Sequence, residues 1–421
     1  MREINETPEL HVDTPRLRGV SVNPDHFVEE DCSISHLHDL EAVFSESLLL
    51  GDPYIIRILM ASVVANRLLG DPFWIFLIAP PSGLKTELIL SLSGLPYIYP
   101  LSDLTARTFA SGMKDANDAS LLPKLKPGTI LALKDFTTIL CMQRDSRREI
   151  LSQLREIYDG SFVKVWGTGK TLDWKGKLGL VAGVTSIIDT HYSIYTVLGE
   201  RFVQYRIQQP NPVEAAKIAI QNQGREAKIR ARLREAVTQF VKGLDLTVVP
   251  DIPKSTSDKL AELAAFVVQA RSGVIRDAYG NKDIEYVPDI EAPARLAKQL
   301  CVFIRALQLI GVKDEYDRYQ ITVRLASHSI HKTRLSIIGL LYLENDTLST
   351  TEIADTFRCP TKTIRRYLED LAGLRIIRRI KQEPPEPDLW ILLDGIVSQI
   401  KSAECGLPLI EVAASLNYSP A

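Results

Sequence analysis

Long apolar runs alternate with helical stretches in the first half of the chain. Three runs are continuous in hydrophobicity and bounded by turn formers: FWIFLIA at 73–79, TILALKDF at 129–136 and LGLVAGVT at 178–185. Such runs are typical of strands buried on both faces of a parallel sheet. Helical patterns begin at Thr86 and cover 145–158, and another helix is expected over 48–69. The alternation predicts an α/β core over roughly residues 50–210.

The rest of the chain is mostly helical, with a compact module near its end. Charged helices are expected over 213–242, 255–272 and 292–311, and an irregular loop over 274–290. The expected domains are an N-terminal extension (1–45), the α/β core (46–210), a helical lid or linker (211–330), the compact module (331–398) and a C-terminal tail (399–421).

Composition and charge narrow the class of protein. With 421 residues, 45% of them hydrophobic, the chain can build more than one domain around a core. Its net charge of -2 excludes a polybasic protein, so any nucleic-acid surface must be a local patch. The five cysteines are dispersed and include no CxxC pair, which indicates neither a disulfide framework nor a zinc module. Without an apolar signal core or a bilayer-length run, we expect a cytoplasmic protein with no membrane partner.

The stretch IAPPSGLKTELI follows the first strand and has the chemistry of a phosphate-binding loop. The pattern G-x-x-x-x-G-K-[ST] puts backbone N–H groups around phosphates, a lysine on the terminal ones and a hydroxyl on Mg²⁺. Lys85 and Thr86 fit, but Ala79 and Leu84 stand where glycines are expected, and Gly83 comes one position early. A positive φ would be costly at Leu84. The alternative is an ordinary strand–turn–helix junction with a surface lysine.

Polar residues also end the next two strands. Asp135 closes the second, where a carboxylate could order the water shell of Mg²⁺ or polarise an attacking water. Alternatively, it only caps the following turn. Thr185, followed by Ser186, closes the third strand, where a hydroxyl could contact the terminal phosphate or the attacking water. We therefore expect one polar edge of the sheet.

A hairpin and two arginines complete the set of candidates. Residues 159–177 alternate as two strands around GTGK, and no helix follows, so we expect a hairpin with Lys170 at its tip and no second phosphate loop. Arg201 follows a short loop in LGERFVQYRI, and Arg295 begins a helix in EAPARLAKQL. Taken singly, either arginine is equally consistent with a solvated helix end.

In this order the features resemble those of an AAA+ ATPase over residues 73 to about 310. The closest branch has a hairpin before its third motif strand and includes the minichromosome-maintenance helicases. GERF resembles the loop that carries their trans-acting arginine, and PARLAKQL resembles their lid helix with its second sensor. Similar features occur in helicase-like ATPases of phages and other mobile elements. This chain departs from the pattern at Leu84 and in lacking an Asp-Glu pair at Asp135.

The resemblance implies a site for ATP and Mg²⁺. The implied nucleotide-binding residues are Ala79, Pro80, Pro81, Ser82, Gly83, Leu84, Lys85, Thr86 and Glu87. The implied catalytic residues are Lys85, Asp135, Thr185 as first sensor, Arg201 as finger and Arg295 as second sensor, with Thr86 and Asp135 on the metal. Because a finger arginine serves the neighbouring subunit, a homo-oligomeric ring is also implied.

The C-terminal module resembles a winged helix-turn-helix. TEIADTF and TKTIRRYLEDLAGL form two helices around a turn, and RIIRRIKQ begins a two-stranded wing. From 358 to 381 there are eight Lys/Arg and two acids, 8 − 2 = +6 locally, which is typical of a phosphate-contacting surface. The candidate DNA contacts are Lys170 in the hairpin, Lys362, Arg365 and Arg366 on the second helix, and Arg378 in the wing. Protein docking is the alternative use of such a module.

Three functions are compatible with these residues. The first is a ring-forming motor that translocates on or remodels DNA, with single-stranded DNA in its channel and duplex at the winged helix. The second is a nucleotide-controlled DNA-binding initiator, loader or regulator without processive unwinding. The third is a nucleotide fold that no longer hydrolyses ATP and acts as a scaffold.

Overall fold

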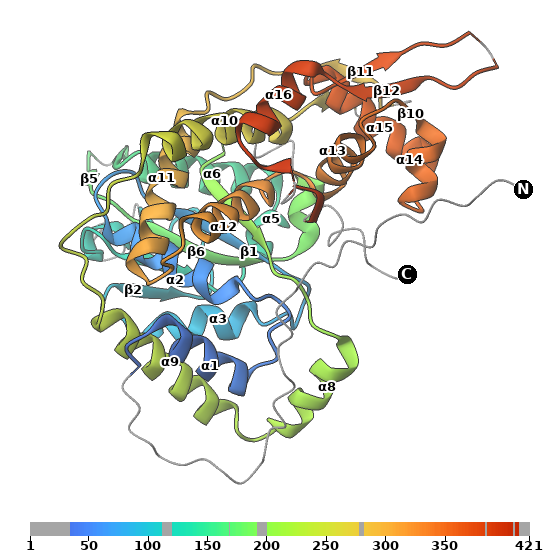
Figure 1. The fold of residues 1–421 in the computed structure, drawn as a ribbon. Helices are drawn as coiled ribbons and strands as arrows, with labels where there is room; N and C mark the ends of the chain where they lie inside the picture. Colours follow the sequence, from blue (N-terminus) through green and yellow to red (C-terminus); the bar gives the residue numbers. More distant parts are fainter. Residues whose placement is uncertain are drawn as a thin grey trace, which may run out of the picture. The chain divides into compact units, whose positions relative to one another are not determined.

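A computed structural model describes residues 34–111, 120–167, 169–191, 200–277, 282–383, 385–406 and 409–411, which all belong to one compact unit beginning at Ile34. Its centre is a five-stranded parallel sheet with helices on both faces, so the α/β prediction is confirmed (Figure 1). In spatial order the strands are β2 (Ile98–Leu101), β3 (Ile130–Leu133), β6 (Gly179–Val184), β1 (Trp74–Ile78) and β7 (Phe202–Arg206).

The order of the strands determines which residues meet. β6 pairs with both β1 and β3, and Ile78 lies opposite Val184. Since all three strands run in one direction, the loops that follow them leave the sheet at the same side, where the strands have their carboxyl ends; this side is called the loop edge. The residue that precedes β7, Arg201, lies at the other edge, because Phe202 is opposite Trp74.

The two faces of the sheet carry separate hydrophobic cores. Alternate residues of β1 point to opposite faces, as the pleat requires. Ile75 and Leu77 join the core built with α2 (Ile55–Arg67), α3 (Lys85–Ser91) and α9 (Glu226–Lys242). Trp74 and Phe76 join the core built with α6 (Arg144–Tyr158) and with the hairpin of β4 (Ser161–Val165) and β5 (Thr171–Lys175).

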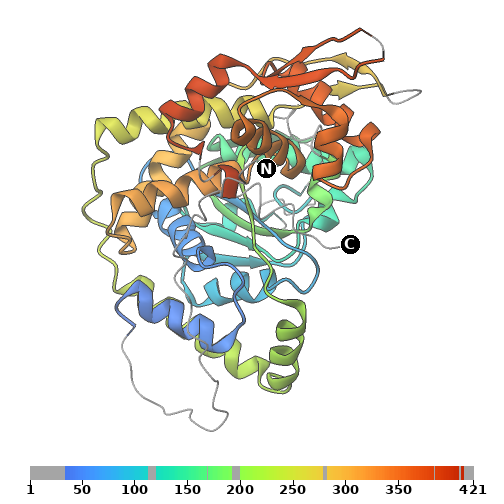
Figure 2. The ribbon, with the colours of Figure 1, turned by 45° about the vertical axis from the view of Figure 1, so that its right-hand side comes forward.

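Several helix boundaries differ from the sequence prediction. The helix expected over 48–69 begins only at Ile55, because the carboxylate of Asp52 accepts the N–H of Tyr54 and the hydroxyl proton of Tyr205, which holds the preceding residues in a turn. The helix expected over 213–242 is two helices, α8 (Pro212–Gln221) and α9, separated at Gly224 with φ +80°. α1 (Leu37–Ser47) crosses the expected boundary at residue 45 and lies beside α9, which also contacts α3 (Figure 2).

The remaining helices of the middle region are α10 (Lys254–Arg271), α11 (Ala294–Leu309) and α12 (Glu315–Ser327). Between α10 and α11, where an irregular loop was expected, β8 (Ile275–Arg276) and β9 (Ile284–Tyr286) form a short antiparallel pair. Among the described helices, none has both the length and the apolar composition that crossing a bilayer requires.

The C-terminal module alternates helices and short strands. Its elements are α13 (Lys332–Glu344), β10 (Leu348–Ser349), α14 (Thr350–Thr356), α15 (Thr361–Gly373), β11 (Ile377–Ile380), β12 (Leu389–Leu392) and α16 (Asp394–Ser402). The three strands form an antiparallel sheet in the order β10-β12-β11. Ile364, Leu368 and Leu371 of α15 are buried, as their spacing predicted.

Candidate functional site

The loop between β1 and α3 contains two residues other than glycine with a positive φ, a backbone conformation that is energetically costly for them. Leu84 has φ 64° and Ser82 has φ 61°, both in the left-handed region. This conformation costs a leucine about 1–2 kcal/mol. Alternating left-handed residues turn successive N–H groups toward one side and create a concave surface that suits an anion. Leu84 therefore adopts the positive φ that a glycine would adopt more easily, and the turn has the left-handed residues typical of anion-binding loops.

Gly83 is the residue on which the tight turn depends. Its N–H donates to the carbonyl oxygen of Pro80 at 3.0 Å. A Cβ at this position would lie 2.8 Å from the Cβ of Ala79 and from the Pro80 oxygen, and 3.0 Å from Oε1 of Gln209. No side chain fits there, so the glycine that comes one position early serves close packing of the loop.

Lys85 folds back over this loop. Its Nζ donates to the carbonyl oxygens of Ala79 at 2.6 Å and Pro80 at 2.7 Å, and the residue is 8% exposed. Burial lowers the pKa of the Lys85 amine, and the negative charge of Asp135 opposes that shift. The carboxylate of Asp135, which follows β3, therefore lies near enough to Lys85 for its charge to favour the ammonium form.

Asp135, Thr137 and Thr185 form a hydrogen-bonded group at the ends of β3 and β6. Asp135 Oδ1 accepts the N–H of Thr137 at 2.8 Å, so Asp135 does cap the following turn. Thr137 Oγ1 accepts the N–H of Thr185 at 3.1 Å and donates to its Oγ1 at 3.3 Å. The first-sensor candidate is thus held against the residues that follow the acid.

Gly183 allows these strands and the loop helix to approach. A Cβ on Gly183 would lie 2.5 Å from the carbonyl oxygen of Lys134 and 3.4 Å from the Cβ of Lys85. Neither Thr137 nor Gly183 was predicted from the sequence to be a residue of the candidate site. The glycine inside an apolar strand was a usable signal, because it often marks a close backbone approach.

The first turn of α3 presents further polar groups. Thr86 is exposed at the second helical position. Glu87 is held by Arg230 of α9, with Arg230 nitrogens at 2.7 and 2.9 Å from its oxygens. This pair fixes α9 against the helix that begins at Lys85.

The donor groups of these residues suit a magnesium–nucleoside triphosphate in their chemistry. The buried ammonium of Lys85 is bound only to carbonyl oxygens that a phosphate could replace. The hydroxyl of Thr86 and the half-buried carboxylate of Asp135 are oxygen ligands of the kind Mg²⁺ prefers. Among the described residues, no cluster of three or more His, Cys, Asp or Glu could hold a metal by itself.

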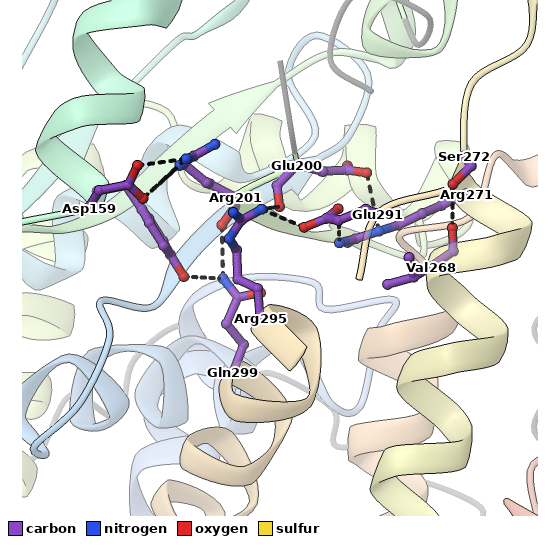
Figure 3. A network of polar contacts seen from close by, with 10 residues as sticks. Asp159, Glu200, Arg201, Val268, Arg271, Ser272, Glu291, Arg295 and Gln299 are labelled. Carbon is purple, nitrogen blue, oxygen red and sulfur yellow. Dashed lines mark hydrogen bonds and ion pairs between the residues drawn. The ribbon is translucent and has the colours of Figure 1, made fainter. Parts of the chain in front are cut away.

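The two candidate arginines lie together, far from Lys85 in the same chain. Arg201 pairs with Asp159 at 2.8 and 3.1 Å, and Arg295 pairs with Glu291 (Figure 3). Gln299 of α11 links the two, because it donates to the carbonyl oxygen of Arg201 at 2.9 Å. The length of β7 alone separates this cluster from the loop edge by about 15 Å.

A buried acid and a buried arginine support this arginine cluster. Glu200 pairs with Arg271 at 3.4 Å, and Arg271 pairs with Glu291 at 3.2 Å (Figure 3). Burial raises the pKa of Glu200 to about 7, against the opposing effect of Arg271. The cluster thus joins the start of β7 to helices α10 and α11, at the end of the sheet opposite the β1–α3 loop.

The hairpin predicted around GTGK is confirmed. β4 and β5 are antiparallel with Val165 opposite Thr171, and Trp166 donates to the Lys170 carbonyl oxygen at 3.0 Å. Phe162, Leu172 and Trp174 anchor one face in the core. Lys170 lies at the tip, partly exposed.

The basic residues of the module are mostly on its surface. Lys362, Arg365 and Arg378 are exposed and Arg366 is half-buried. Arg365 pairs with Glu369 at 3.2 Å, whereas Lys362 and Arg378 form no salt bridge within the described residues. Of the exposed cations on α15, Lys362 therefore stands outside the salt bridges of the described residues, whereas Arg365 shares Glu369 with Arg276 of β8.

No protein-family model matches this sequence, and a comparison with curated proteins finds no match.

Proposed function

We propose that this chain is a ring-forming AAA+-type ATPase that translocates on or remodels DNA. The observation that carries the proposal is the meeting of Lys85, Asp135 and Thr185 at one edge of a parallel sheet. Each residue ends or follows a different strand, so the constellation depends on the strand order and on no local stretch of sequence. An ordinary strand–turn–helix junction does not require an acid and a second polar strand end beside its lysine.

The roles of the residues follow from their chemistry. Lys85 exchanges its two carbonyl contacts for phosphate oxygens, and the N–H groups of the loop bind the same anion. Bound Mg²⁺, held by Thr86 and Asp135, would neutralise phosphate charge. Asp135 uses one oxygen to cap a turn, and its other oxygen can accept a proton from water. Thr185 is held by the hydroxyl of Thr137, whose backbone N–H binds Asp135.

The position of the arginines supports assembly. Arg201 and Arg295 lie at the sheet edge opposite the loop, so they serve a nucleotide only in a neighbouring copy. A head-to-tail contact of this kind closes into a ring when the rotation permits. The ion pair with Asp159 must open before Arg201 reaches a neighbour's phosphate.

DNA binding rests on two surfaces. The helix–turn–helix of α14 and α15 followed by the β11–β12 wing has the order of elements of a winged helix, and its exposed cations suit duplex phosphates. Lys170 at the hairpin tip suits a single strand inside a ring.

A second candidate is a nucleotide-controlled DNA-binding initiator, loader or regulator. It is favoured by the single acid at Asp135 and by the pairing of Arg201 inside its own chain, because both reduce turnover without preventing nucleotide binding. In this function ATP drives assembly on DNA without processive unwinding.

ATP turnover and solution mass, each measured with and without single-stranded DNA and Mg²⁺, separate the two. A motor assembles with ATP, hydrolyses faster with DNA, and loses turnover in Lys85→Ala and Arg201→Ala. Lys170→Ala keeps basal turnover and loses the stimulation. ATP-dependent oligomers with slow, DNA-insensitive turnover would support the second candidate, and a chain that binds no nucleotide would refute both.

A further inference from the structure

A series of buried polar contacts leads from the edge of the sheet at Thr185 to helix α15. The 3₁₀ helix Ser186–His191 begins directly after Thr185 and carries Asp189. Asp189 pairs with Arg206 at the end of β7 through Nη1 to Oδ2 at 2.9 Å and Nη2 to Oδ1 at 2.7 Å. Both side chains are at most 10% exposed, so this contact is shielded from solvent. The segment after the first-sensor candidate is therefore tied to β7.

β7 is in turn tied to the junction between α12 and α13. The backbone N–H of Arg206 donates to Nδ1 of His328 at 3.0 Å, and that of Gln204 donates to the hydroxyl of Ser329 at 3.2 Å. Edge-strand N–H groups usually face solvent or another strand. Here they are used by the connection that leads into the C-terminal module.

His331 carries the series to α15. It begins α13 and accepts the N–H of Thr333 through Nδ1 at 3.2 Å. Its Nε2 lies 3.4 Å from the hydroxyl of Tyr367 on α15, and the two rings are 4.9 Å apart. Tyr367 is on the inner side of the helix whose outer side carries Lys362.

The far end of α15 is held just as firmly. Asp370 pairs with Arg334 of α13 at 3.0 Å and with Arg276 of β8 at 2.7 Å. Gln269 of α10 donates to the carbonyl oxygen of Leu374 at 2.8 Å. These contacts tie α15 to α10, β8 and α13, the helix that begins at the α12–α13 junction.

We propose that the contacts Asp189–Arg206, Arg206–His328 and His331–Tyr367 couple the nucleotide state sensed at Thr185 to the DNA affinity of α15. This inference rests on the proposed function. A nucleotide that shifts the segment 185–189 changes the geometry of a shielded ion pair, which favours one of two arrangements of the junction. By linkage, duplex DNA must then change nucleotide affinity by the same factor by which nucleotide changes duplex affinity.

The test uses the full chain, a fluorescein-labelled duplex of about 20 base pairs and a fluorescent, slowly hydrolysed ATP analogue with Mg²⁺. Duplex affinity is measured with and without the analogue, and analogue affinity with and without duplex. We expect the two ratios to agree and to be at least about fivefold, the lower range of coupling between sites. In Tyr367→Phe, and in the paired replacement Asp189→Leu with Arg206→Met, we expect both ratios to fall toward one while each separate affinity changes less than twofold.

The control is Tyr316→Phe, which removes the hydroxyl of a tyrosine that is 63% exposed and should keep the full ratios. The paired replacement removes both charges together, so it leaves no unpaired buried ion that could unfold the chain. If the unmodified protein binds duplex and analogue independently, or if Tyr367→Phe and the paired replacement both keep full coupling, the inference is overturned. Absence of nucleotide binding or of duplex binding would instead show that the proposed function has failed.

Discussion

Asp189 and Arg206 are joined by two hydrogen bonds of 2.7 and 2.9 Å in a pair whose side chains are 10% and 7% exposed. The pair lies between the segment after β6 and the end of β7. Its burial makes it costly to break, because removal of one partner leaves the other charge without solvent or a counter-ion.

Asp189→Asn should lower the free energy of unfolding by about 3–5 kcal/mol, the usual cost of one unpaired buried charge. Denaturant unfolding without nucleotide measures it. The matched control is Glu404→Gln, which breaks a 2.6 Å pair with Lys259 whose acid is 57% exposed, and which should cost less than about 1 kcal/mol. Equal and small losses for the two variants would show that the Asp189–Arg206 pair is not structurally important.

His331 should make stability depend on pH. Burial lowers its pKa to about 4 from an ordinary value of 6.5. The unfolded chain therefore binds more protons between these values, and the His331 contribution is fully present above pH 6.5 and is lost as pH falls toward 4. The contribution is about 3 kcal/mol at most.

His331→Asn isolates this effect, because asparagine is also a good acceptor at a helix start but does not titrate. Glu200, with its raised pKa of about 7, acts in the opposite direction and is present in both proteins. The difference in unfolding free energy between wild type and His331→Asn should therefore shrink as pH falls from 7 to 4. A constant difference would contradict the assignment.

Gly83→Ala should damage the loop while leaving the fold intact. Its Cβ would lie 2.8 Å from two loop atoms, and relieving such overpacking costs about 1–3 kcal/mol. We expect about a tenfold loss of Mg·ATP affinity with little change in circular dichroism. Gly167→Ala, which meets nothing within 4 Å at the hairpin, is the control and should bind ATP normally. Equal affinities in the two variants would argue against a phosphate site at this turn.

The module should bind duplex DNA through its exposed cations. Lys362→Ala and Arg378→Ala should each weaken binding and reduce the slope of log K against log salt by about one. Fluorescence anisotropy between 50 and 200 mM salt, values chosen to span a large change in affinity, measures both effects. Lys313→Ala removes an exposed lysine outside the module and should leave the slope unchanged. Identical slopes in all the variants would favour a protein-docking module.

The central strands were predictable because they are continuous apolar runs, as in β1, β3 and β6. The two edge strands were not. β2 contains Tyr99 and Pro100, which are exposed at the sheet edge. β7 contains the buried polar residues Gln204 and Arg206. The α12–α13 junction accepts their backbone N–H groups, Glu200 accepts from the Gln204 amide, and Asp189 pairs with the Arg206 guanidinium. The burial of these polar residues depends on segments far away in the sequence, so the local pattern of hydrophobic and polar residues does not predict this strand.

The candidate site was predictable in its residue types and less so in its arrangement. Lys85, Asp135 and Thr185 each follow a recognisable strand, so the parallel sheet brings them together. The bridging role of Thr137 depends on two strand ends that are 48 positions apart. The grouping of Arg201 with Arg295 depends on how α11 lies against the start of β7.

The central claim is that Lys85 binds the phosphates of ATP, and the most direct measurement is a calorimetric titration of Mg·ATP into the wild type and into Lys85→Ala. Lys126→Ala is the control, because Lys126 is an exposed lysine before β3 at the opposite end of the strands. Loss of a charged donor to phosphate costs about 1.5–3 kcal/mol, or about 10- to 150-fold in affinity. The account predicts saturable binding that Lys85→Ala weakens to that extent and Lys126→Ala leaves intact. Equal affinity in wild type and Lys85→Ala, or no binding by the wild type, would contradict it.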